Sequence, residues 1–179
     1  MLTKNYYKAL AAVFRGITSS GNGNFNLIRQ NGYAVPIDYY QARYYVTHSH
    51  PAKIVVDASK QTYGYIAAHA GIAFGDGNKA PTVDDITLSG NLITTLTGTV
   101  SHDTIMNDNG CETTFLYTLT NTGSTSVTIK ELGIFSSFHA SDADTACLID
   151  RVVLDEPVTI PASGIGMVTY TFKVNYPTT

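Results

Sequence analysis

The last strand-like stretch of the chain restricts its fold more than any other feature of the sequence. Between Val168 and Tyr176, apolar and polar residues alternate at every position, with one side formed by Val168, Tyr170, Phe172, Val174 and Tyr176. Successive side chains of a β-strand point to opposite faces, so this period of two predicts a strand with one buried face. Valine, threonine and aromatic residues, which suit a pleated, half-buried surface, fill the stretch. The pattern is typical of a β-sandwich or barrel.

Similar stretches precede it at spacings of roughly 8–12 residues, with turns rich in Gly, Asn and Pro between them. We expect strands at residues 65–74, 99–106, 112–120, 125–135, 146–154, 158–160 and 168–176, with short ones at 43–48 and 52–56. The alternation changes phase near Lys130–Glu131, which predicts a β-bulge, and Asp155-Glu-Pro157 predicts a break between two strands. The fold expected is mainly β, an antiparallel β-sandwich of immunoglobulin-like or jelly-roll type.

The first 60 residues follow other patterns. Residues 2–14 predict a helix, because Leu2, Tyr6, Ala9, Leu10 and Val13 recur along one face at helical spacing. Residues 16–24 are rich in Gly, Ser and Asn and predict a loop, and the segment after them is rich in tyrosine. We therefore expect two parts: residues 1–60, an N-terminal helix and extended, Tyr-rich basic docking arm, and residues 61–179, the β-sandwich domain.

Two sets of side chains in this arm are predicted to form an interface. They are Leu2, Tyr6, Leu10 and Val13 on the helix, and Tyr39, Tyr40, Tyr44 and Tyr45 in the Tyr-rich segment. Tyrosine joins a large apolar ring to a polar tip, which suits a surface that is buried against another chain yet partly wet. Packing of the tyrosine rings on the sandwich is an equally good interpretation, and the two are compatible.

Charge is distributed unevenly along the chain. Residues 1–60 hold seven Lys and Arg against two Asp, a net +5, and the remainder holds four against twelve Asp and Glu, a net −8. A basic arm can lie against nucleic acid or an acidic neighbour, including another copy of the chain. Because the positive charges are dispersed, nucleic acid is disfavoured as a partner. No apolar run approaches the roughly 18 residues that span a bilayer, so no membrane partner is expected.

No group of residues forms a recognisable catalytic, metal or cofactor site. His48 and His50 lie on one strand face but lack a third ligand. Residues 75–79 are glycine-rich but lack the Lys-Ser/Thr step of a phosphate loop. Two acidic sets are candidates, the first for calcium and the second for glycoside hydrolysis: Asp76, Asn78, Asp84 and Asp85, and Asp142, Asp144, Asp150, Asp155 and Glu156. The first does not match the spacing of an EF-hand loop, and clustered acids like the second more often form a solvated face, so we expect no enzyme and no cofactor.

The two cysteines, Cys111 and Cys147, are far apart in the sequence. The N-terminus shows no signal-peptide pattern, so the default expectation is two buried thiols without a disulfide.

Two parts of the chain resemble a known family. The stretch from Ile72 to Leu88 resembles the "G-x-G … P-T … D-x-x-L" segment of small structural proteins of tailed bacteriophages. Lys130-Glu-Leu-Gly-Ile-Phe135, Leu148-Ile-Asp-Arg-Val-Val-Leu-Asp-Glu-Pro-Val-Thr-Ile160 and Val168-Thr-Tyr-Thr-Phe172 resemble the "E-x-G-L/I-F … L-x-R … D-P-V-T-I … V-T-Y" pattern of the same proteins. The resemblance covers about Gly64 to Tyr176 and leaves the first 60 residues aside.

The resemblance implies a non-enzymatic virion component. Its partners would be other copies of itself and other virion proteins of the capsid, portal or tail, and its location the virion, after synthesis in the bacterial host cytoplasm. Glu131, Arg151 and Asp155 are expected to form a structural ion-pair cluster, with Gly133 allowing a close backbone approach. The alternative function is a surface-binding module, a carbohydrate-binding or host-adhesin β-sandwich, for which the tyrosines of the arm would be the binding platform.

Overall fold

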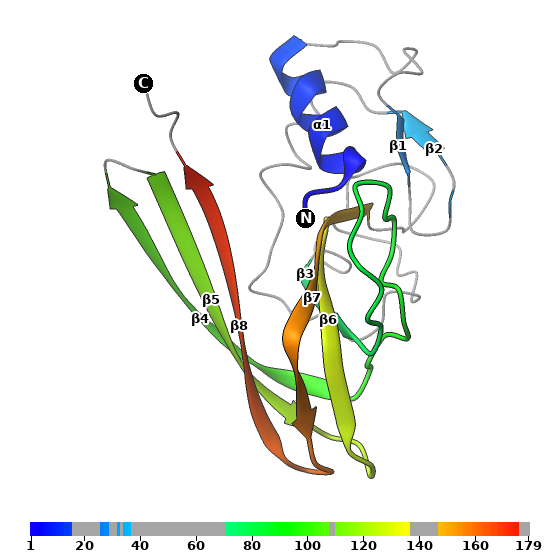
Figure 1. Ribbon diagram of the computed structural model, residues 1–179, viewed down its shortest axis with the longest axis vertical. Coiled ribbons are helices and arrows are strands. Elements are labelled where there is room, and N and C mark those ends of the chain that lie inside the picture. The colour runs from blue at the N-terminus through cyan, green and yellow to red at the C-terminus, as the bar shows by residue number, and fades with distance from the viewer. Residues whose placement is uncertain are drawn as a thin grey trace, which may run out of the picture.

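The computed structural model describes residues 1–15, 26–28, 32, 34–36, 71–107, 110–136 and 147–175, and these residues are mainly β (Figure 1). The elements are helix α1 (Lys4–Arg15) and strands β1 (Asn26–Ile28), β2 (Ala34–Pro36), β3 (Gly71–Gly75), β4 (Leu96–Asn107), β5 (Gly110–Asn121), β6 (Val127–Ser136), β7 (Cys147–Ile160) and β8 (Ile165–Asn175). Two three-stranded antiparallel sheets have the orders β3-β6-β7 and β4-β5-β8, and β1 pairs with β2. The expected mainly β fold with one N-terminal helix is confirmed. The short strands expected at 43–48 and 52–56 lie outside the described residues.

The core lies between the two three-stranded sheets. Phe74 from the first sheet and Tyr117 from the second are buried and meet edge to face, with ring centroids 5.6 Å apart. Leu119 of β5 is flanked in the ladder by Gly98 and Gly166. A Cβ on Gly166 would lie 2.7 Å from the buried side chain of Ile160, so the missing side chain lets β7 approach β8 closely.

The alternation in the last strand predicts its buried face correctly over the first half of β8. Val168 and Tyr170 are buried, whereas Thr169 and Thr171 are exposed. Toward the end of the strand the residues of the apolar face become exposed to solvent, and Val174 is 47% exposed. Tyr176 lies outside the described residues.

The phase change in β6 is a β-bulge, as expected. Ile129 pairs with Val158 and Glu131 with Val153, so Leu154–Pro157 stand opposite Lys130 alone. The break expected at Asp155–Pro157 is wrong, because β7 runs without interruption from Cys147 to Ile160. A proline has no N–H to donate, and the bulge places it where no ladder hydrogen bond is required.

The N-terminus is part of the β-structure. Met1–Thr3 runs beside β7, where the Thr3 amide donates to the Ile149 carbonyl at 2.8 Å and the Arg151 amide to the Met1 carbonyl at 3.3 Å. Helix α1 then begins at Lys4 and buries Ala9 in the core. The expected helix is confirmed. The boundary expected between residues 60 and 61 lies outside the described residues and stays a prediction.

Candidate functional site

The most polar part of the interior is an ion-pair cluster on β6 and β7. The Arg151 side chain is fully buried, and its Nε lies 2.7 Å from Glu131 while its Nη1 lies 2.6 Å from Asp85. The pair of Glu131 with Arg151 agrees with the prediction from sequence. Asp155 does not belong to the cluster, because it lies in the bulge and is exposed. The third member is Asp85, from the loop between β3 and β4.

Glu131 ties that loop to the sheet. Its carboxylate accepts hydrogen bonds from the amides of Gly77, Ser89 and Gly90 at 3.2, 3.1 and 2.7 Å. Burial alone would raise the pKa of Glu131, but the hydrogen bonds from these amides and from Arg151 outweigh it and hold the pKa below its usual range. A carboxylate with this many donors is an acceptor that organises the loop, and it stays ionised.

The same loop contains the residues considered for phosphate and calcium. Asp76 accepts hydrogen bonds from the amide and side chain of Asn91, and these bonds lower its pKa. Burial would raise the pKa of Asp85, but bonds from Thr82 and Arg151 outweigh burial and lower it. Both carboxylates therefore close the loop on itself. Among the described residues no group of three or more His, Cys, Asp or Glu is placed to hold a metal ion.

The close approach at Gly133 differs from the expected one. Its neighbours are the side chains of Leu88 and Leu148, each 2.9 Å from where a Cβ would stand, rather than a backbone. Gly133 therefore makes room for the small apolar cluster under the loop that precedes β4.

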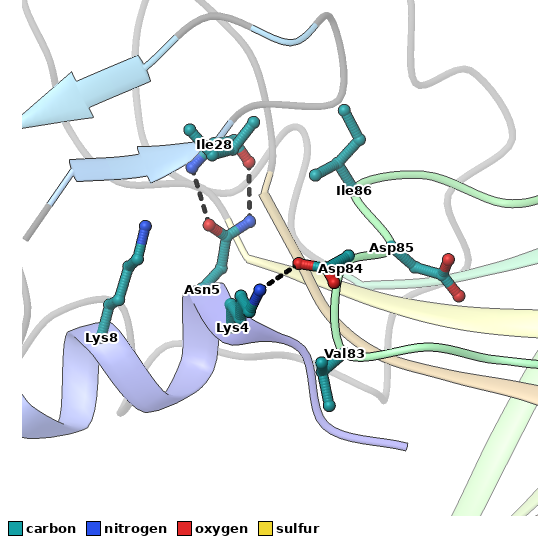
Figure 2. A pocket seen from close by; sticks show the side chains of 8 residues that line it. All are labelled: Lys4, Asn5, Lys8, Ile28, Val83, Asp84, Asp85 and Ile86. Carbon is teal, nitrogen blue, oxygen red and sulfur yellow. Dashed lines mark hydrogen bonds and ion pairs between the residues drawn. The ribbon is translucent and has the colours of Figure 1, made fainter.

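A pocket of about 260 Å³ lies between α1, β1 and the loop before β4 (Figure 2). Asn5 forms its wall by pairing with Ile28 as a strand would: its Nδ2 donates to the Ile28 carbonyl at 2.6 Å, and its Oδ1 accepts from the Ile28 amide at 2.7 Å. Lys4 pairs with Asp84 across the mouth. These polar groups hold the helix against the loop, and the pocket is smaller than the usual range for ligand sites, which begins at about 300 Å³.

Asp150, one of the acids considered in the sequence, is buried in β7. Its Oδ2 accepts a 2.6 Å hydrogen bond from the Tyr170 hydroxyl, and its Oδ1 lies 2.6 Å from the Met1 ammonium nitrogen. Burial first, and then the charge of Asp150, raise the pKa of the Tyr170 phenol. The group joins β7, β8 and the N-terminus, which is a structural role. Asp142 and Asp144 lie outside the described residues.

Among the described residues, most of the exposed large apolar side chains lie on the sheet β4-β5-β8, whose strands extend away from β3-β6-β7 (Figure 1). We call the extended part the free end; it comprises residues 99–107, 110–116 and 169–175. A row of rings across the sheet marks its start: Phe115 lies 5.9 Å from His102 and 6.3 Å from Tyr170, centroid to centroid. Along this row burial falls from Tyr170, which is buried, to His102, which is exposed.

Beyond the ring row, both faces of the sheet carry exposed apolar side chains. On the face that continues the core, Met106 is 71% and Val174 is 47% exposed, with Cys111 half-buried between them. On the opposite face Ile105 is 56% exposed, and Leu116, Ile165 and Met167 follow toward the base of the sheet at 38, 69 and 63%. Threonines and other polar or charged residues occupy most of the remaining positions of that face, so a polar background surrounds the apolar groups. Cys111 and Cys147 do not form a disulfide.

The predicted interface residues have mixed positions. Leu2 and Tyr6 are half-buried against the core of their own chain. Leu10 and Val13 lie in α1, but their side chains are outside the described part, as are all of Tyr39, Tyr40, Tyr44 and Tyr45. Their role in an interface stays a prediction. Sequence reasoning did not single out the apolar residues of the free end, because a strand pattern does not show where the opposing sheet stops.

The described residues thus define a mainly β-protein of two antiparallel sheets, one of which is partly uncovered. Comparisons with protein-family models, curated proteins and solved structures found no match for this chain. Within the described ranges, no helix is long and apolar enough to cross a membrane.

Proposed function

We propose that this protein is a non-enzymatic structural subunit of a bacteriophage virion. In this proposal it is a homo-oligomeric β-sandwich of immunoglobulin-like or jelly-roll type that docks on the capsid or tail through its N-terminal part. The family resemblance suggests the class, and the observation that carries the proposal is the free end of the sheet β4-β5-β8.

The free end has the character of a contact surface. Single exposed apolar residues are ordinary on a soluble protein, but here they occur on both faces of the same strands. Met106 on one face is 71% exposed, and Ile105 on the other is 56% exposed. Methionine adapts its shape to a partner, and threonine presents a methyl group and a hydroxyl at low conformational cost. A rigid sheet with such faces is suited to repeated contacts between subunits.

The interior polar groups support a structural role. Glu131, Arg151 and Asp85 bond to one another and to loop amides, and Asp150 is engaged by Tyr170 and the N-terminus. In each case the charge is used to fix a loop or a chain end, as an assembly subunit requires of its scaffold.

The N-terminal part supplies a second contact region in this proposal. One side of α1 packs on the core, while Tyr7 on the other side is 53% exposed. The first 60 residues carry a net +5 and the remainder a net −8, so the basic part of one subunit complements the acidic part of its neighbour.

Composition of purified particles tests the proposal. Virions of the phage whose genome encodes this chain are purified from a lysate on a density gradient and washed at high salt. Mass spectrometry then quantifies the proteins in the washed particles. The proposal expects the protein at a fixed, multiple copy number per particle. Its absence from washed particles, with the protein abundant in the unassembled fraction, would overturn a virion role, and binding of that fraction to host cells or glycans would favour the surface-binding module.

A further inference from the structure

The fold covers two of its sheet edges, those of β3 and β7, with its own segments. The outer edge of β3 is covered by the next loop, where the Ile93 amide donates to the Phe74 carbonyl at 2.8 Å. The outer edge of β7 is covered by Met1–Thr3 and then interrupted by the bulge at Leu154–Pro157. Edge strands expose unpaired amides and carbonyls that can pair with another chain, and such covering prevents it.

The edge of β4 is different. Its twelve residues pair with β5 in one continuous register without a bulge, and none of them is Pro, Lys or Arg. Within the described residues no segment pairs with its other side. The second edge of this sheet, β8, carries Lys173 and lies on the side nearer to β7, whereas β4 lies on the far side (Figure 1). Among the described residues, β4 is therefore a long and regular edge strand that no segment covers.

The hydrogen-bonding groups of β4 that point outward can be identified. The Thr104 amide donates to the carboxylate of the adjacent Asp103 at 2.9 Å, so it points to the open edge rather than to β5. In an antiparallel ladder alternate residues direct both backbone groups to the same side. Val100, His102 and Met106 therefore also present their amides and carbonyls outward.

We propose that this edge binds the β4 edge of a second copy of the chain, antiparallel about a two-fold axis, to form a continuous six-stranded sheet. This inference deepens the proposed function and rests on its claim of self-association. It assigns the contact between copies to the β4 edge rather than to the N-terminal part. Identical edges meet in a closed, two-fold manner only when the strands run antiparallel.

Charge and shape select the register. Paired residues must lie on the same face, and the single charge, Asp103, must not oppose its own copy. Centring the pair on His102 places Asp103 opposite Ser101 and uses almost the whole strand. It also places Met106, 71% exposed, opposite Gly98, which has no side chain. The exposed methionine of each copy thus finds space at the partner's only glycine in this strand.

Cysteine cross-linking of the full chain tests the contact. In a Cys111→Ser background, His102→Cys is expected to form a disulfide-linked dimer under mild oxidation, because residues at the two-fold axis lie about 5.5 Å apart between Cα atoms. Ser101→Cys would cross-link instead if the register is shifted by one pair. Thr118→Cys, on the central strand β5 and exposed, is the matched control and should stay monomeric.

Light scattering on the full chain is the second measurement. The unchanged protein is expected to be a dimer, and His102→Lys, which places two positive charges opposite each other at the two-fold axis, should raise the dimer dissociation constant at least tenfold. The control Thr118→Lys should leave it unchanged, with circular dichroism showing all variants folded. A monomer at every concentration, or a dimer that cross-links at neither His102 nor Ser101 or equally well at Thr118, would overturn the inference.

The two proposals fail in distinguishable ways. A β4-linked dimer that is absent from purified particles would leave the edge contact standing and remove the virion role. If the protein is found in particles but shows no contact at β4, the virion role stands and the edge contact is removed.

Discussion

A single buried arginine links strand β6 to the loop between β3 and β4. Arg151 is fully buried between Glu131 and Asp85, and also donates to the Lys79 carbonyl at 2.5 Å. A buried ion pair contributes little net stability relative to apolar side chains, but removing one partner leaves an uncompensated charge in the interior. The main effect of the cluster is therefore to select one conformation of the loop, and its net contribution to the free energy of unfolding is small.

Replacing the central carboxylate should be costly. Glu131→Gln is expected to lower the free energy of unfolding by about 3–5 kcal/mol, because Arg151 loses its fully buried counter-charge while it stays buried. Glu112→Gln is the control: Glu112 lies 3.5 Å from Lys173 on the exposed surface, where such a pair is worth about 0–1 kcal/mol. Urea unfolding measures both. Equal effects of the two substitutions would contradict the buried cluster.

Acidic pH should lower the free energy of unfolding through the same carboxylates. Glu131 and Asp85 have lowered pKa values in the folded state, so the unfolded chain, with pKa values of about 4.3 and 3.9, binds protons more readily. Their contribution is complete above about pH 5 and is lost as the pH falls through the folded-state values. Urea unfolding from pH 7 to pH 3 should therefore show a steep loss below about pH 4.5, with a shallower slope in Glu131→Gln.

The sequence predicts part of this cluster and misses the rest for a physical reason. Glu131 and Arg151 lie on neighbouring strands of one expected sheet, so their pairing follows from strand order. Asp85 comes from a loop, and its approach depends on the amides of Ser89 and Gly90 that fold that loop around Glu131. Asp155 follows Arg151 on the same strand, but it lies in the bulge and is exposed, so it does not reach the cluster.

Strand identity follows from alternation, but the extent of burial does not. The same period of two runs through β8 from the buried Val168 to Val174, which is 47% exposed. Alternation shows which side chains share a face of the sheet. How far along the strand that face is buried depends on the length of the opposing sheet. For the same reason the free end of the sheet could not be predicted, although the strands that form it could.

Close contact between β7 and β8 depends on a residue without a side chain. In Gly166→Ala the new Cβ would stand 2.7 Å from the side chain of Ile160, which is fully buried. We expect the overpacking to cost about 1–3 kcal/mol. Ile160→Val in the same background should recover part of this loss, because the shorter side chain relieves the contact. A thermal-unfolding double-mutant cycle without such coupling would argue against this packing.

Across the whole molecule, the N-terminus acts as an extra strand. Besides its backbone bonds, Thr3 donates its hydroxyl to the buried Leu148 carbonyl at 2.6 Å. Thr3→Val keeps the shape but leaves that carbonyl unpaired, and should lower the free energy of unfolding by about 1–3 kcal/mol. It should also speed hydrogen exchange of the Arg151 amide, which bonds to Met1. Thr118→Val, on an exposed strand face, should do neither.

The pairing of Met1–Thr3 with β7 also orders events during folding. These contacts join residues that are 145 to 150 positions apart in the chain. Residues 1–3 must therefore wait for β7 before they find their partners. Long-range pairing of this kind slows folding, because chain entropy is lost before the contacts form. The edge of β7 stays open until residues 1–3 pair with it, so during that interval it can pair with a wrong strand.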